Sequence, residues 1–235
     1  MPNHITNLIT VTGDADKVAA FRAAHVREID GRPLFDFDTI IPKPQCVKDT
    51  SRDFNPTDHL ATVGNAQVEL YALALLRRGG HFTERARYPW IPSDVRTWDD
   101  VVTWLAAKYP TVDKWGRAAL RCAADTGYPG WYEWSCANWG TKWGAYEYKE
   151  RSHEPGRFVF EFQTAWSPPR PIFNKAAEIW PELTIDVEAI DEGGPEYVGR
   201  YHDAERTLEE VDKDLERYRR VYGREPDGDD AESAS

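Results

Sequence analysis

The chain has 235 residues, of which 41% are hydrophobic and 13% aromatic, enough for a packed core in one large domain or two small ones. The mean hydropathy of −0.66 is typical of a soluble protein. No apolar run approaches the roughly 18 residues that a membrane-spanning helix needs, and the first residues lack the basic and apolar regions of a secretory signal. We therefore expect a cytoplasmic protein without a membrane partner.

The negative charge is concentrated in the C-terminal part of the chain. The formal net charge is −11, and residues 182–235 alone contain eighteen Asp and Glu against seven Lys and Arg. The 181 residues before them are therefore neutral, with 22 acidic and 22 basic side chains. Because a neutral body offers no basic footprint for a phosphate backbone, general nucleic-acid binding is possible but not favoured.

The first forty residues predict a β-α-β unit. Residues 4–12 are rich in β-branched side chains, which favours a strand. Apolar residues then recur at three- and four-residue steps over 15–28, which predicts a helix. A second strand is expected over 34–40, before the prolines at 42 and 44.

Residues 45–143 have a different character and predict a helical insertion. Helical periodicity is found over 65–78, 98–109, 112–125 and 130–138. The insertion falls where two β-α-β halves would join.

Period-two patterns return after Gly144. We expect strands over 145–150, 157–166, 183–190 and 197–201, a hairpin turn at 154–156 and a helix over 171–180. Two split β-α-β halves dock into one antiparallel sheet with helices on one face, which is the ferredoxin-like α+β plan. The predicted organisation is thus a single ferredoxin-like domain over 1–203, a charged C-terminal helix over 204–222 and a disordered acidic tail over 223–235.

Three segments of the chain resemble the YubB-like family of phage and plasmid proteins. They are residues 1–7, which include Asn3 and Asn7, with Thr12-Gly13; the string Trp131-Tyr-Glu-Trp134…Asn138-Trp-Gly-Thr-Lys-Trp143; and residues 162–169. The resemblance implies a ferredoxin-like fold and a mobile-element origin. It implies no settled activity, so no catalytic residue is carried over.

The most distinctive local feature is the group of four tryptophans within residues 131–143. Such aromatic density is typical of a core seam or of a ligand-stacking surface. In the ligand interpretation, polar groups lie between indole rings and contact a base, sugar or anion. In the seam interpretation, which we favour, the segment joins the insertion to the sheet. The candidate binding residues are Asn138, Trp139, Thr141, Lys142 and Trp143, together with Trp166.

Two asparagines in the first strand form a second candidate feature. Asn3 and Asn7 share the face of Ile5 through the two-residue period of a strand. Buried amides need partners, so we expect them to latch the strand to residues 131–143 or to residues 162–166 rather than to contact a ligand.

The sequence contains no recognisable catalytic, metal or cofactor motif. The six histidines are scattered without triad or zinc spacing, and no phosphate-binding glycine motif is present. The three cysteines are widely spaced and are best explained as incidental thiols. We predict no catalytic residues, no metal and no cofactor.

The residues and the resemblance together predict a non-catalytic protein-binding module encoded by a phage or plasmid, whose partner is a host or phage protein. Inhibition of a host defence system is the specific hypothesis. The alternatives are a single-stranded nucleic-acid binder with an aromatic surface, for which Phe158, Phe160 and Phe162 are also candidates, and an uncharacterised enzyme. We favour packing of these phenylalanines beneath helices. The oligomeric state stays open, since a sheet edge can pair.

Overall fold

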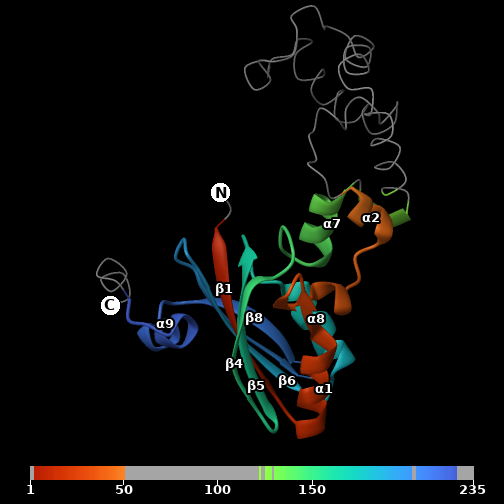
Figure 1. The fold of residues 1–235 in the computed structure, drawn as a ribbon. Helices are drawn as coiled ribbons and strands as arrows, with labels where there is room; N and C mark the ends of the chain where they lie inside the picture. The colour runs from red at the N-terminus through yellow and green to blue at the C-terminus, as the bar shows by residue number, and fades with distance from the viewer. Residues whose placement is uncertain (1–2, 51–121, 123–124, 129, 203–204, 227–235) are drawn as a thin grey trace, which may run out of the picture. The chain divides into compact units, whose positions relative to one another are not determined.

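The computed structural model describes residues 3–50, 122, 125–128, 130–202 and 205–226 (Figure 1). The chain divides into two compact units, one of Met1–Pro42 with Ser135–Ser235 and one of Lys43–Trp134. In the second unit the structure describes α2 (Gln45–Asp49), and the unit boundary falls within α7 (Trp131–Asn138). The other helices predicted for the insertion lie almost entirely outside the described residues.

The first unit contains a six-stranded antiparallel sheet in the order β4-β5-β1-β6-β7-β8 (Figure 1). Its strands are β1 (His4–Thr12), β4 (Tyr146–Glu154), β5 (Arg157–Ala165), β6 (Thr184–Asp191), β7 (Glu196–His202) and β8 (Glu205–Val211). Helix α1 (Ala15–His25) connects β1 to β4, and α8 (Arg170–Ile179) connects β5 to β6. Strands β1 and β4, the pair connected through α1, have β5 between them, and strands β5 and β6, the pair connected through α8, have β1 between them. This interleaving is the ferredoxin-like arrangement, so the predicted ferredoxin-like α+β fold is confirmed.

The insertion occupies nearly the predicted residues, Lys43–Trp134, but a different place in the topology. The strand expected over 34–40 is β3 (Arg32–Phe35), which pairs with β2 (Val26–Ile29) in a separate two-stranded sheet and is followed by the 3-10 helix η1 (Phe37–Thr39). Pro33 has no amide proton and the Asp36 carboxylate accepts the Asp38 amide, so the segment suits an edge and a turn rather than an inner strand. The insertion therefore interrupts the first β-α-β half, and the β4–β5 hairpin joins the two halves.

One face of the sheet is covered by α1 and α8 (Figure 1). Phe158, Phe160 and Phe162 project from β5 on this face and are completely buried. Phe35 contacts two of them, with ring centroids 4.9 Å from Phe160 and 5.3 Å from Phe162. The predicted packing of these phenylalanines is confirmed, and base stacking on them is excluded because no ring surface is exposed.

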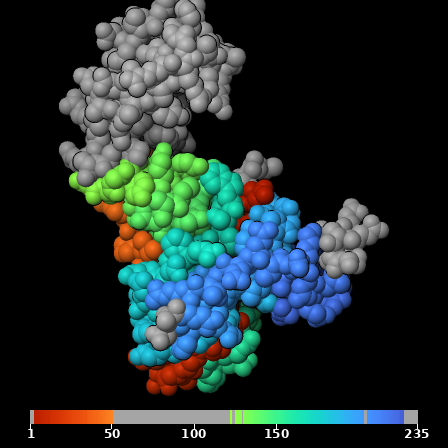
Figure 2. Space-filling view, turned by 180° about the vertical axis from the view of Figure 1, so that it is seen from behind, coloured from red at the N-terminus to blue at the C-terminus, as the bar shows by residue number. Residues whose placement is uncertain are grey.

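The prediction of a charged helix over 204–222 is wrong for the first half of that range, because Glu205–Val211 form the edge strand β8. Gly199 of β7 lets the two strands approach, since a Cβ atom there would lie 2.4 Å from the carbonyl oxygen of Thr207. Helix α9 (Leu215–Tyr222) begins after the Asp214 cap. Seen from behind, the residues of β7, β8 and α9 form one continuous stretch of the surface (Figure 2). The acidic tail predicted to be disordered over 223–235 is described up to residue 226. Gly223 ends α9 and Glu225 pairs with Arg219, so the prediction is wrong for this part, and residues 227–235 lie outside the described residues.

None of the described helices is long and apolar enough to cross a membrane.

A neutral histidine closes the core between α1 and α8. His25 is 3% exposed, and its Nε2 accepts the indole N–H of Trp180 at 2.8 Å. Its Nδ1 donates to the Thr39 hydroxyl at 2.7 Å, because that hydroxyl itself donates to the Asp36 carbonyl. Both ring nitrogens are therefore used by the neutral form, and burial lowers the pKa of His25 to about 4.

We expect His25 to make the protein sensitive to acid. The folded pKa lies below the ordinary value of 6.5, so the unfolded chain takes up the proton first. The stabilisation is complete above about pH 6.5 and is lost as the pH falls toward 4, by roughly 2 to 3 kcal/mol. Urea denaturation across this range should show a clearly smaller pH dependence for His25→Gln. The matched control is His153→Gln, which changes an exposed histidine and should follow the wild type. Parallel curves for all three proteins would contradict the assignment.

Candidate functional site

Helix α9 covers part of the sheet face opposite α1 and α8. Period-two alternation places Leu8, Val159 and Ile190 on this face, and Val221 of α9 is completely buried against them. Tyr218 and Tyr222 pack around the same cluster. The helix is therefore held to the sheet by an apolar seam along one of its sides.

An ion pair fixes the N-terminal end of α9, and a hydrogen bond fixes its C-terminal end. At its N-terminal end, Arg217 donates to the carboxylate of Glu196, and both side chains are almost completely buried. The same carboxylate accepts the amide of Asp214 at 3.2 Å. At the C-terminal end, Arg151 of β4 donates to the Val221 carbonyl at 3.1 Å. Because the apolar seam alone is short, these contacts set the position of the helix.

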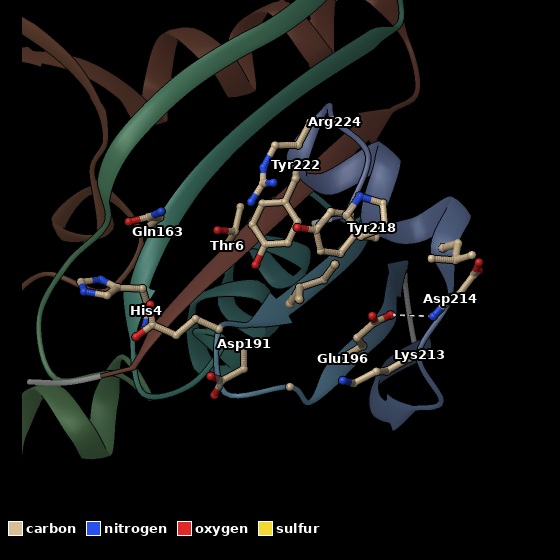
Figure 3. Close-up of a pocket in the computed structure, with 15 residues that line it drawn as sticks. His4, Thr6, Gln163, Asp191, Glu196, Lys213, Asp214, Tyr218, Tyr222 and Arg224 are labelled. Atoms are coloured by element: carbon tan, nitrogen blue, oxygen red, sulfur yellow. Dashed lines mark hydrogen bonds between the residues drawn. The ribbon is translucent and has the colours of Figure 1, made fainter. Parts of the chain in front are cut away.

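A cavity of about 280 Å³ lies between α9 and strands β1, β5 and β6 (Figure 3). Its wall is partly polar and partly apolar, and the lining includes four carboxylates and two basic side chains. The lining residues are His4, Thr6, Gln163, Ile190, Asp191, Glu192, Gly194, Glu196, Lys213, Asp214, Leu215, Tyr218, Tyr222, Arg224 and Pro226.

Two neighbouring carboxylates at the end of β6 form the acidic side of the cavity. Asp191 accepts the Gly193 amide at 2.6 Å and the Asn3 side-chain amide at 3.3 Å. Glu192 accepts the His4 amide at 3.0 Å. These bonds orient both carboxylates, and each carboxylate has lone pairs enough to accept further donors.

The opposite wall is aromatic. The rings of Tyr218 and Tyr222, one helical turn apart on α9, lie 4.6 Å apart at 52° to each other (Figure 3). The guanidinium carbon of Arg224 lies 5.8 Å and 5.9 Å from their centroids. Such faces attract cations.

His4 connects the cavity to the tyrosine of the β4 edge. The Tyr146 hydroxyl donates to the Thr164 carbonyl at 3.2 Å, so the Nδ1–H of His4 donates to the hydroxyl oxygen at 2.6 Å. Burial, and then the charge of Glu192, raises the pKa of Tyr146 to about 12. The phenol therefore stays protonated and holds the histidine ring in place.

The carboxylates and aromatic rings of this cavity are suited to binding a cation. Among the described residues, no group of three or more His, Cys, Asp and Glu side chains could hold a metal ion. None of the three cysteines forms a disulfide, and burial raises the pKa of Cys122 to about 11, which keeps its thiol unreactive.

The predicted tryptophan-segment residues lie outside this cavity. Trp139 is 5% exposed, donates its indole N–H to the Ile41 carbonyl at 2.9 Å and meets Phe37 edge-on. Thr141 is buried and donates to the Trp143 carbonyl. Asn138 is half-buried at the end of α7. Trp139 and Thr141 are thus core residues of the first unit.

Lys142, Trp143 and Trp166 come together at the surface. The ammonium of Lys142 lies 4.8 Å from the Trp143 ring centroid and 4.9 Å from that of Trp166. Trp166 is 43% exposed and has a φ of 74°, an unusual conformation for a bulky residue. Its amide donates to the Asn3 carbonyl at 3.0 Å.

The two predicted asparagines have separate positions. Asn7 is completely buried, and its amide donates to Thr164 Oγ1 at 3.0 Å, to the Ile5 carbonyl at 3.1 Å and to the Phe162 carbonyl at 3.4 Å. This is the latch to the 162–166 strand that the sequence predicts. Asn3 is exposed and instead bonds Asp191 at the rim of the cavity.

The sequence reasoning missed the cavity residues on α9 and β6. Tyr218 and Tyr222 are four residues apart and Arg224 follows them, a spacing that predicts ring contact and a nearby cation on a helix. That signal was present in the C-terminal segment. The sequence gives no comparable signal for Asp191 and Glu192, because only the fold brings these two residues near α9.

Comparison with known proteins supports the C-terminal part of this description. Residues 142–228 match the family model described as the ferredoxin-like domain in Api92-like protein. This stretch includes every cavity residue except His4 and Thr6. A crystal structure of a protein api92 from Yersinia pseudotuberculosis is similar at a TM-score of 0.45 and 10% sequence identity, over 91% of this chain and 99% of that chain. No curated protein matches the chain.

We expect the buried ion pair to be the main anchor of α9. Arg217→Met leaves the Glu196 carboxylate buried without its partner, which should lower the free energy of unfolding by about 3 kcal/mol. Arg219→Met is the matched control, since Arg219 pairs with Glu216 and Glu225 in solvent and should cost less than about 1 kcal/mol. Urea denaturation measures both values. Equal losses in the two variants would show that Arg217 is no special anchor.

Proposed function

We propose that the chain is a non-catalytic protein-binding module whose cavity beneath α9 holds a lysine or arginine side chain of its partner. The observation that carries this proposal is the pairing of the Asp191 and Glu192 carboxylates with the Tyr218–Tyr222 ring pair around one cavity (Figure 3). A basic side chain needs an acidic group for its charge and an aromatic face for its stem or guanidinium. Both kinds of group line the same cavity.

The chain itself contains an example of this recognition. Arg224 lies over both tyrosine rings, so the ring pair already accepts a guanidinium. An entering basic side chain would use the carboxylate side of the same cavity, where Asp191 and Glu192 are oriented by backbone amides. Lys213 and Arg224 offset part of the negative charge of the cavity lining. The lining still has more carboxylates than basic side chains, which favours a cation.

The overall charge distribution supports a basic partner. The net charge of −11 falls entirely within residues 182–235, which include β6, β7, β8 and α9. A one-sided charge of this kind steers an oppositely charged partner and raises the association rate. Association should therefore weaken as the salt concentration rises.

The biological setting is part of the proposal. We propose a YubB-like protein of a phage or plasmid that acts in the cytoplasm and binds a host or phage protein, with inhibition of a host defence system as the specific hypothesis. Its support is the resemblance of residues 1–7 with 12–13, of residues 131–143 and of residues 162–169 to that family. The cavity supplies the chemistry by which such a partner would be recognised.

A second candidate function is supported by the surface cluster of Lys142, Trp143 and Trp166. Two indole faces beside an ammonium are suited to stacking a base next to a phosphate. We expect the protein-binding function to prevail, and hence no salt-dependent quenching of tryptophan fluorescence by single-stranded oligonucleotides. Quenching that is lost in Trp166→Ala would establish the second function instead.

The cavity proposal can be tested with a random peptide-display library. Panning should enrich sequences that contain Arg or Lys, and Glu192→Gln should weaken the binding of a selected peptide about fivefold in fluorescence anisotropy. Glu182→Gln is the matched control, because Glu182 is exposed and outside the cavity. Enriched peptides without basic residues, or equal binding by the two variants, would contradict the proposal.

A further inference from the structure

The strand β8 forms one edge of the six-stranded sheet. It pairs with β7 on one side, and within the described residues no strand pairs with its other side. Only Leu208 of this strand is buried, and Val211 is half-buried. An edge of this kind presents backbone donors and acceptors to another strand.

The side chains of β8 alternate between the two faces of the sheet. Leu208 lies opposite Gly199 on the face covered by α8, and Arg206 and Glu210 share that face by the two-residue period. Glu205, Thr207, Glu209 and Val211 lie on the other face. Each face therefore has its own charge pattern.

This pattern can be tested against pairing with a second copy. In antiparallel pairing of two β8 strands, each face of one sheet continues into the same face of the other when a two-fold axis passes through one residue of β8. That residue then lies opposite its own copy. Centring on Arg206, Glu209 or Glu210 puts that charge opposite its own copy, and centring on the residue after Arg206 puts Glu205 opposite Glu209. Like charges directly opposite are destabilising. Of the registers centred on residues 206–210, only the one centred on Leu208 avoids them.

The register centred on Leu208 is also attractive. It places Arg206 opposite Glu210 of the second copy twice, on either side of a Leu208–Leu208 contact, and Thr207 opposite Glu209. Arg206 already bonds Glu178 at 2.9 Å, and a guanidinium with five N–H donors can serve a second carboxylate. The Leu208 carbonyl accepts from Arg170 and, with two lone pairs, can accept another donor.

We propose that two copies of the chain associate through β8 in this register, which makes one continuous antiparallel sheet through both. The association is weak and concentration-dependent, because the contact is a strand edge with one apolar pair at its centre. No residue of β8 lines the cavity, although Val211 at the end of the strand pairs with Glu196, which does.

Charge exchange tests the register with the full-length chain. Sedimentation equilibrium from about 1 μM to about 1 mM should show the wild type rising toward the dimer mass. Glu210→Arg and Arg206→Glu each place like charges opposite, and each should raise the dissociation constant about tenfold or more. An equimolar mixture of the two variants restores both opposite-charge pairs and should dimerise within about threefold of the wild type.

Glu209→Arg is the matched control. Its side chain is exposed, like that of Glu210, but it lies opposite Thr207 in this register, so dimerisation should be unchanged. Recovery on mixing requires two folded variants, which separates loss of pairing from loss of folding. A wild type that stays monomeric, a Glu210→Arg variant that dimerises normally, or a mixture that does not recover would each overturn the proposal.

Discussion

Apolar side chains on both faces of the sheet are the constraint on which the rest of the structure depends. The helices α1 and α8 cover one face, and Leu8, Val159 and Ile190 require cover on the other. The only described helix on that face is α9, whose eight residues span about 12 Å, whereas the nine-residue strands beneath it span about 30 Å. The helix cannot cover the face completely. The cavity lies where this cover is incomplete, between α9 and strands β1, β5 and β6.

Much of the fold was predictable, because the period-two patterns after Gly144 are clear. Phe158, Phe160 and Phe162 alternate strictly, and their burial follows from that alternation. The sequence-based predictions were wrong where the local residue pattern suggests one secondary structure and the strand pairing in the fold requires another. Residues 34–40 read as a sheet strand, yet which strand they pair with is a long-range property. Residues 205–211 read as helix because they are charged, but their strand conformation depends on the space that Gly199 leaves in β7.

The candidate site was less predictable than the fold. The aromatic density of residues 131–143 drew attention to Trp139 and Thr141, which are buried, because aromatic side chains signal packing as strongly as binding. The cavity combines His4 from the start of the chain, Asp191 from β6 and Tyr222 from α9, and no sequence window contains all three. Asn7 was correctly predicted as a latch, since a buried amide in a central strand must bond its neighbours.

The position of β1 has a consequence for how the chain assembles. This strand is the earliest described element, and its two neighbours are β5 and β6, so that His4 lies opposite Ala165 and Ile5 opposite Asp191. During synthesis β1 and α1 therefore emerge well before any strand that can shield them. Contacts between residues so far apart in the sequence slow folding. Until the partner strands have been synthesised, the apolar side chains of β1 stay exposed and can aggregate. A chaperone on the ribosome would shield the apolar side chains of β1 and α1 during this interval.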